Sequence, residues 1–340
     1  MKTRMTCAVV GIGALFSVQM ALADVVQMKN GDRITGKLAA MAGDKLSIST
    51  GYGDVAVKWS EVASVVTDGP AEIMLDDKTL LSGKVSSGSA GTLNITSNEI
   101  AQSAPIALTR VSYINPPAEV TGRGLKLHAR VNAGAARTSG NTDTQSIHLD
   151  GEAVARGVTN RYTVGAIYNE AKSSGTETTN NSTGYMKYDH FFEEKMYGYV
   201  NGIFTKDKFK DLNLRTALGV GAGYQVFESA LTNLSVEAGL NYVNEDFNVA
   251  ADDSYPAARW ALNYDRFLLS DAMQFFHMHE IYFGLKDSSN ILLRSQTGLR
   301  VPLFQGMNAT AQVNYDWDKS PPLGAKKADT AYLFTLGYAW

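Results

Sequence analysis

Apolar and polar residues alternate at period two through most of the chain after Leu125. The clearest case sets Ala309, Ala311, Val313, Tyr315 and Trp317 on one face, against Asn, Thr, Gln and Asp side chains on the other. Because successive side chains of a strand point to opposite faces, this pattern predicts strands with one dry and one polar face. Several such segments reach ten or more residues, enough to cross a bilayer at a tilt, which takes about 9–11.

The connections between these segments differ in length. Tight connections are expected at residues 157–160, 193–195, 228–231, 270–272 and 304–306, and longer polar ones at 138–142, 173–180, 206–211, 245–253, 286–290 and 318–329. Short turns at one end and longer loops at the other are typical of outer-membrane barrels. The sequence therefore predicts an all-β fold with a transmembrane antiparallel β-barrel of about 12 strands over residues 125–340. The alternative is a soluble periplasmic β protein whose charged faces meet water.

The last segment, Asp329–Trp340, places large side chains on one face and mostly small ones on the other. It resembles the closing strand of bacterial outer-membrane barrels, whose terminal aromatic residue is recognised by the barrel assembly machinery. The resemblance implies an assembly signal made of Tyr332, Phe334, Leu336, Tyr338 and Trp340. On this interpretation the partners are outer-membrane lipid and the assembly machinery.

The first 23 residues read as a signal peptide. Lys2 and Arg4 precede an apolar stretch from Cys7 to Val18, and Ala21-Leu22-Ala23 forms a cleavage site before Asp24. Cys7 is the single cysteine of the sequence, so the mature chain would contain no thiol for a disulfide, a metal or a nucleophile.

Residues 24–115 contain an internal repeat, with copies at 25–69 and 72–115. Val25–Leu38 aligns with Glu72–Val85, and the segment from Val57 to Val62 aligns with Ile106 to Val111. We expect a small β-rich periplasmic domain of short strands, similar to SH3-like or Sm-like barrels, that either binds a periplasmic partner or serves as a spacer. Residues 116–124, which begin Pro116-Pro117, are the expected linker.

Composition narrows the function classes. The net charge of −3, with no dense run of Lys and Arg, gives no reason to expect a nucleic-acid partner. No apolar run in the mature part approaches the roughly 18 residues of a spanning helix, and the mean hydropathy is −0.15. Barrel strands remain compatible with such values, because their two faces average out.

Together, several short motifs resemble one family. They are N-G-D-R-I-T-G and W-S-E-V in the repeat, the Pro-Pro linker, T-S-G-N-T at Thr138–Thr142 and the terminal G-Y-A-W. In this combination the chain resembles the salt-induced outer-membrane protein family. The resemblance implies outer-membrane placement and a link to salt or osmotic stress, and it implies no catalytic residues.

The polar faces of the strands carry charges of both signs. The lumen-facing candidates are Lys126, Arg130, Asp150, Glu152, Arg156, Arg161, Lys187, Asp189, Arg215, Glu237, Arg259, Asp265, Arg294, Arg300, Asp316 and Asp318. They either line a narrow water-filled pore or neutralise one another and fill the lumen, and the sequence leaves both open.

Candidate chemistry is sparse. His277 and His279 share a strand face, but a metal usually needs three or four ligands, so no metal and no cofactor is expected. Ser146 and His148, beside Asp150, could imitate the nucleophile and base of an outer-membrane phospholipase. The prediction is a non-enzymatic barrel acting as a narrow pore or an envelope-integrity protein. The alternative is a lipid-modifying enzyme.

Overall fold

A computed structural model of the protein describes residues 23–89, 91–97, 103–229, 231–269, 272–287, 290–322 and 324–340. The expected signal peptide lies, up to residue 22, outside the described residues. The chain divides into two compact units, Met1–Pro117 and Ala118–Trp340. Within the described part of the chain, no helix has the length and apolar character needed to span a membrane.

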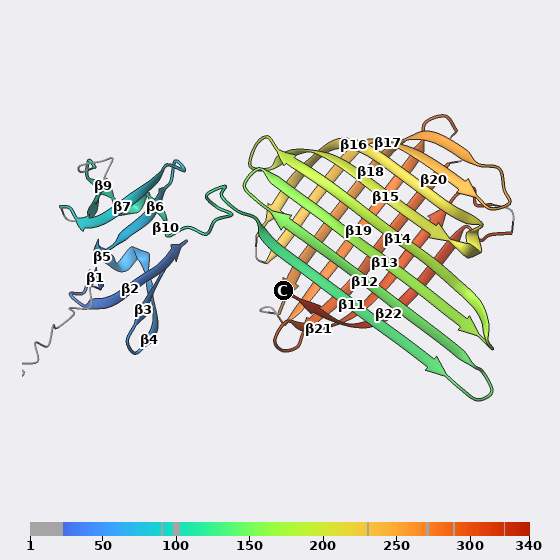
Figure 1. The fold of residues 1–340 in the computed structure, drawn as a ribbon, viewed down its shortest axis with the longest axis horizontal. Helices are drawn as coiled ribbons and strands as arrows, with labels where there is room; N and C mark the ends of the chain where they lie inside the picture. The colour runs from blue at the N-terminus through green and yellow to red at the C-terminus, as the bar shows by residue number, and fades with distance from the viewer. Residues whose placement is uncertain are drawn as a thin grey trace, which may run out of the picture. The chain divides into compact units, whose positions relative to one another are not determined.

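The N-terminal unit contains two copies of one structural plan: four strands, a short 3₁₀ turn and a fifth strand (Figure 1). The first copy consists of β1 (Asp24–Met28), β2 (Arg33–Ala42), β3 (Lys45–Thr50), β4 (Gly53–Lys58), η1 (Trp59–Glu61) and β5 (Val62–Val66). The second consists of β6 (Pro70–Leu75), β7 (Leu80–Ser87), β8 (Thr92–Thr96), β9 (Ile106–Ala107), η2 (Leu108–Arg110) and β10 (Val111–Ile114).

Both copies contribute to a single hydrophobic core, in which Leu46 and Leu93 are fully buried. The strands also join the copies, since β10 pairs with β6 of its own copy and with β2 of the other. The two 3₁₀ turns are linked as well, because the indole Nε1 of Trp59 donates to the carbonyl oxygen of Leu108 at 3.0 Å. The repeat therefore folds as one unit.

The second unit is a closed antiparallel barrel in which each strand pairs with the next and β22 pairs with β11 (Figure 1). Its strands are β11 (Lys126–Thr138), β12 (Thr144–Arg156), β13 (Asn160–Ser173), β14 (Thr176–Phe191), β15 (Met196–Asp207), β16 (Leu212–Glu228), β17 (Thr232–Phe247), β18 (Asp253–Leu268), β19 (Met273–Gly284), β20 (Ile291–Pro302), β21 (Met307–Asp318) and β22 (Ala328–Ala339). The prediction of a 12-stranded barrel after a β-rich domain is confirmed.

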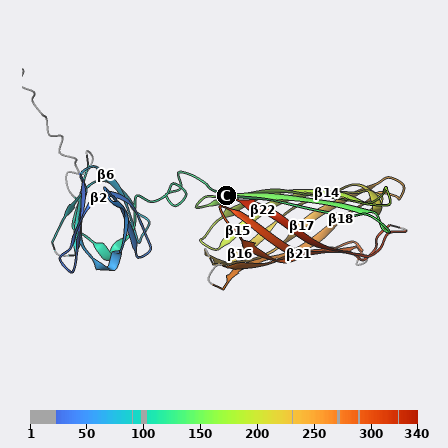
Figure 2. The ribbon, with the colours of Figure 1, turned by 90° about the horizontal axis from the view of Figure 1, so that it is seen from below.

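The alternation of residue types becomes an alternation of faces. Leu218, Val220, Leu240 and Phe334 are among the apolar side chains exposed on the outer surface. Polar residues from the other face of the same strands lie in the interior that the ribbon of the barrel surrounds in Figure 2, and several of them, such as Asn201 and Glu237, are buried. The outside of the barrel is therefore apolar and the inside polar, as a period of two requires.

One expected loop is wrong. The sequence predicts a long polar loop over residues 173–180, but β13 continues to Ser173 and β14 begins at Thr176. Only Ser174 and Gly175 form the turn, and both have positive φ angles, 49° and 78°, as in a two-residue hairpin. The polar run looked like a loop because Thr and Asn occupy both faces of β14 here, so its alternation of apolar and polar residues is lost.

The region expected to be a linker has local order. The backbone amides of Arg123 and Gly124 both donate to the carbonyl oxygen of Ala118, at 2.9 and 3.0 Å. These hydrogen bonds close a compact turn just before β11.

Candidate functional site

Charged side chains from strands that are not neighbours meet across the barrel interior. Lys187 of β14 donates to Glu237 of β17, and Arg161 of β13 donates to Gln225 of β16 at 2.9 Å. Because β14 and β17 are separated by two strands in the closed sheet, this contact has to pass through the lumen.

Glu237 lies at the centre of these contacts and is 1% exposed. Its Oε1 accepts hydrogen bonds from Lys187 Nζ and from the Tyr197 hydroxyl, the latter at 2.9 Å. Its Oε2 accepts from Arg259 Nη1 at 2.9 Å, and Arg259 also forms an ion pair with Glu280 at 3.3 Å. Three donors thus share one buried carboxylate, which is how a buried charge is tolerated.

The contacts continue to a second buried carboxylate, Asp189, which is fully buried. Lys187 lies 3.1 Å and Arg161 lies 2.5 Å from its carboxylate oxygens. We name the whole set the cross-lumen network: Arg161, Lys187, Asp189, Tyr197, Glu237, Arg259 and Glu280.

Glycines on the inner face of β16 make room for the tyrosine rings of β15. A Cβ added to Gly223 would lie 2.2 Å from the ring of Tyr197, and one added to Gly221 would lie 2.5 Å from the hydroxyl of Tyr199. The Tyr199 hydroxyl in turn accepts a hydrogen bond from Arg259 at 3.1 Å. The glycine positions therefore let large side chains extend across the lumen.

A second polar cluster lies on β11, β12 and β14. Arg130 and Glu152 form an ion pair at 3.3 Å, and the Tyr185 hydroxyl donates to Glu152 at 2.9 Å. Nearby, Asp150 accepts a hydrogen bond from Asn132 at 2.8 Å.

The Ser146 and His148 pair does not form a catalytic arrangement. His148 is buried, and its Nε2 lies 3.0 Å from Asp150 while its Nδ1 lies 2.6 Å from the side-chain oxygen of Asn169. Since both ring nitrogens are engaged by other residues, neither is available to take a proton from Ser146.

Most of the remaining charged candidates form ion pairs. Arg156 pairs with Glu228 at 3.0 Å, Arg294 pairs with Asp316 at 3.2 Å, and Arg215 pairs with Glu245 and, at 3.2 Å, with Asp318.

The other three candidates are placed differently. Asp265 accepts hydrogen bonds from Asn233 and Gln274, and Arg300 donates to Gln274 at 2.8 Å. Lys126 is exposed at the start of β11.

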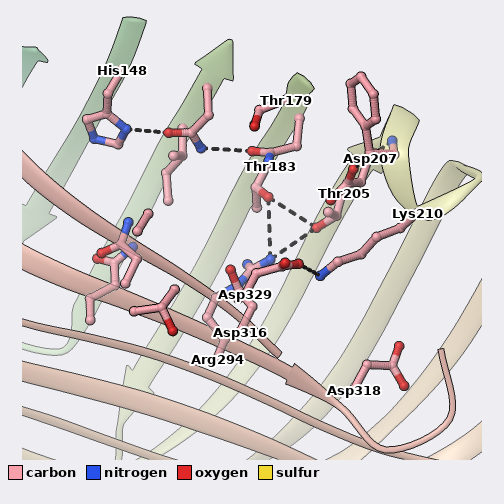
Figure 3. Close-up of a pocket in the computed structure, with 18 of the residues that line it drawn as sticks. His148, Thr179, Thr183, Thr205, Asp207, Lys210, Arg294, Asp316, Asp318 and Asp329 are labelled. Atoms are coloured by element: carbon pink, nitrogen blue, oxygen red, sulfur yellow. Dashed lines mark hydrogen bonds and ion pairs between the residues drawn. The ribbon is translucent and has the colours of Figure 1, made fainter. Parts of the chain in front are cut away.

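A cavity of about 790 Å³ occupies the end of the barrel that carries the longer connections. We name it the vestibule. Its wall includes Thr183 and Thr205 from the strands and Lys210 from η3 (Lys208–Lys210), and Glu280 of the cross-lumen network also lines it. Figure 3 shows Lys210 and Asp329 reaching toward one another, at 2.7 Å, and Arg294 reaching toward both threonines.

The two histidines of β19 face outward. The indole of Trp260 donates to Nε2 of His279 at 3.2 Å, which leaves the proton of that ring on Nδ1. This Nδ1 donates to His277 Nε2 at 3.0 Å, and His277 Nδ1 donates to the Thr297 hydroxyl at 2.7 Å. All four ring nitrogens of the two histidines therefore have hydrogen-bond partners while both rings are neutral. Among the residues that the structure describes, no group of three or more His, Cys, Asp or Glu side chains is placed to hold a metal ion.

The closing strand β22 turns its large side chains outward: Tyr332, Phe334, Leu336, Tyr338 and Trp340 are all exposed. Its inner face is small for a geometric reason. A Cβ at Gly337 would lie 2.0 Å from the Asn132 side-chain oxygen and 2.9 Å from that of Asn308. Neighbouring side chains thus occupy the space beside this glycine.

A family model described as "Protein of unknown function, DUF481" matches residues 131–340, which is most of the chain and nearly the whole barrel. The chain belongs to the DUF481 family. The comparison with curated proteins found no significant match.

Solved structures resemble the DUF481 chain only distantly. The translocator domain of the autotransporter NalP from Neisseria meningitidis has 16% identity and a TM-score of 0.36, covering 64% of this chain and 88% of its own. The NanC porin has 10% identity and a TM-score of 0.36, covering 63% and 97%. Likeness at this distance does not indicate a shared activity.

Sequence reasoning missed several lumen residues of this DUF481 barrel. Tyr185, Tyr197 and Tyr199 supply hydroxyls to the charged clusters, and Glu280 pairs with Arg259. The period-two pattern did contain a signal for two of them, because Tyr197 and Tyr199 lie on the same face of β15 as the polar Asn201. Their aromatic side chains pointed to the wrong location, since aromatic residues in a barrel are expected at the lipid interface.

Proposed function

We propose that this protein is a non-enzymatic outer-membrane β-barrel whose lumen is closed by its own side chains, and that it serves envelope integrity. The apolar outer surface supports membrane insertion, since a closed barrel leaves no strand edge in lipid. The family name suggested by the sequence motifs adds a role under salt or osmotic stress.

The observation that carries this proposal is the burial of the cross-lumen network. Asp189, Glu237 and Arg259 are at most 7% exposed, although they lie on the lumen face of their strands. In a water-filled pore of the kind that selects ions, charged rings would be hydrated. Here the charges bind one another and Tyr197, which favours a filled lumen at this level.

The positions of the chain ends support an orientation. Ala129 and Trp340 exchange backbone hydrogen bonds of 3.0 and 3.1 Å, so β11 begins beside the end of β22. Both lie at the end of the barrel with the short turns, which in outer-membrane barrels faces the periplasm. We infer that residues 24–115 are periplasmic and that the outward aromatic residues of β22 form the signal for the assembly machinery.

A narrow pore is the second candidate, and the vestibule favours it. The vestibule of about 790 Å³ already opens part of the barrel interior, and Glu280 of the cross-lumen network lines it. A lipid-modifying enzyme is less well supported, because His148 is held on both ring nitrogens.

Planar-bilayer recording on the purified full-length mature protein separates the two candidates. We expect electrically silent insertions, verified by flotation of the same preparation with vesicles. Reproducible conductance steps in the unmodified protein would contradict the closed-lumen proposal and support the pore. For the stress role, a strain lacking the gene should lose viability in raised NaCl, and unchanged growth would remove that part.

A further inference from the structure

The two strands that close the barrel separate before they end. β11 and β22 are in register from Arg130 to Ala133, opposite Leu336 to Ala339, and one further pair, Ala129 and Trp340, exchanges backbone hydrogen bonds beside this ladder. The other two ladders of these strands are much longer, with thirteen pairs between β11 and β12 and eleven between β21 and β22. The closing seam is therefore the least paired part of the wall that the structure describes.

Both strands continue beyond this ladder. If the register were extended, Ala136 would face Leu333 and Thr138 would face Ala331. Instead, residues 135–138 of β11 and 328–332 of β22 are exposed. We name the gap between residues 135–138 and 331–334 the seam notch.

The vestibule reaches this notch. Its lining includes Ala136 and Leu333, which face inward, and also Ala135 and Phe334, which face outward from the same two strands. Since no ladder joins the two strands at this height, the wall does not close the cavity there. The vestibule therefore opens sideways as well as toward the loops.

The residue types on the outer face of the two strands indicate the level of the notch relative to the membrane. On β11 the outward residues stay apolar up to Ala135 and are followed by Arg137, while on β22 they change from Phe334 and Tyr332 to Thr330. Aromatic and charged residues at the end of an apolar band mark the membrane interface. The notch thus lies where acyl chains meet head groups, and unpaired backbone groups are tolerated there because water and head groups can bind them.

The charges exposed in the vestibule indicate the type of head group. Asp316 and Asp329 have side chains 45% and 53% exposed, whereas their cationic partners Arg294 and Lys210 are 26% and 19% exposed. At these two ion pairs, a group entering the vestibule meets the carboxylates more readily than the guanidinium or ammonium groups, and the exposed Lys326 is a further cation of the lining. An ammonium group complements this surface.

We propose that the vestibule and seam notch bind an amphiphile of the outer leaflet, with its amino-bearing head beside Asp316 and Asp329 and its acyl chain leaving through the notch along Phe334. This inference rests on the proposed insertion into the outer membrane. Apolar contact outside and charge contact inside would together fix the head at the level of the interface.

The test uses the full-length mature protein in a neutral maltoside detergent, with lysophosphatidylethanolamine as the probe and native mass spectrometry as the measurement. Lysophosphatidylglycerol of the same chain length should bind about tenfold more weakly, equivalent to about 1.4 kcal/mol. Glycerophosphoethanolamine, which has the head but no chain, should also bind at least about tenfold more weakly. Equal affinity for all three, or adventitious micelle-like uptake of both lipids, would overturn the proposal.

Closing the notch supplies the second arm. The double variant Ala136→Cys/Leu333→Cys should bind the probe when reduced and lose it when oxidised. Its matched control, Val131→Cys/Tyr338→Cys, lies in the part of the seam that is already paired and should bind in both states. If the notch cysteines do not oxidise, Ala136→Trp fills the same gap and should weaken binding about tenfold.

Binding that survives both closure of the notch and Ala136→Trp would show that the acyl chain does not pass through the wall. Failure of the proposed membrane insertion has a different signature, because the unmodified protein would then not float with vesicles. The two failures are thus distinguishable.

Discussion

Replacing Glu237 with alanine tests whether the lumen is filled and dry. The change removes the acceptor shared by Lys187, Tyr197 and Arg259 and leaves two cations in a buried setting. Breaking a buried ion pair by deleting one partner costs about 3–5 kcal/mol. Lys187 keeps Asp189 at 3.1 Å and Arg259 keeps Glu280 at 3.3 Å, so we expect the lower end, about 3 kcal/mol.

The matched control is Glu228→Ala. Glu228 also pairs with an arginine on another strand, Arg156 at 3.0 Å, but its side chain is 40% exposed. Exposed pairs contribute about 1 kcal/mol or less. Urea unfolding of both variants in the same vesicles, followed by tryptophan fluorescence, gives the free energies of unfolding. Equal losses in the two variants would refute the view that Glu237 is desolvated, and with it the closed lumen.

Two further substitutions probe the seam and the N-terminal unit. Gly337→Ala places a methyl group against the Asn132 side chain and should reduce barrel stability by about 1–3 kcal/mol. Its control is Gly184→Ala, where the added Cβ meets open space. Equal heat resistance of the folded band of both variants in gel electrophoresis would contradict the predicted crowding at Gly337. Trp59→Phe removes the donor to the Leu108 carbonyl oxygen and should lower the free energy of unfolding of the N-terminal unit by about 1–2 kcal/mol. Amide hydrogen exchange of β2 in the full chain measures this loss. Unchanged protection of those amides would show that the hydrogen bond contributes nothing to stability.

The sequence predicted the barrel because period two survives wherever one face contacts lipid. On β21, for example, Ala309, Val313 and Tyr315 alternate with polar residues over the full strand. The prediction lost accuracy at β14 between Thr176 and Asn181, where both faces are polar and periodicity carries no signal.

The partners within the lumen could not be predicted in the same way. Parity indicates that Lys187 and Glu237 point inward, but they are fifty positions apart and on strands separated by two others. Which inward charges meet depends on strand tilt and on the size of intervening side chains, such as the glycines of β16. Those properties belong to the closed barrel and not to any single segment.

The tandem arrangement of the N-terminal unit has an evolutionary consequence. Its core is built from both copies, and β10 of one copy extends β2 of the other. A chain containing a single copy would cover the same apolar surface only by associating with another molecule of itself. The tandem is thus arranged like two joined subunits that share one core, to which Leu46 of the first copy and Leu93 of the second both belong.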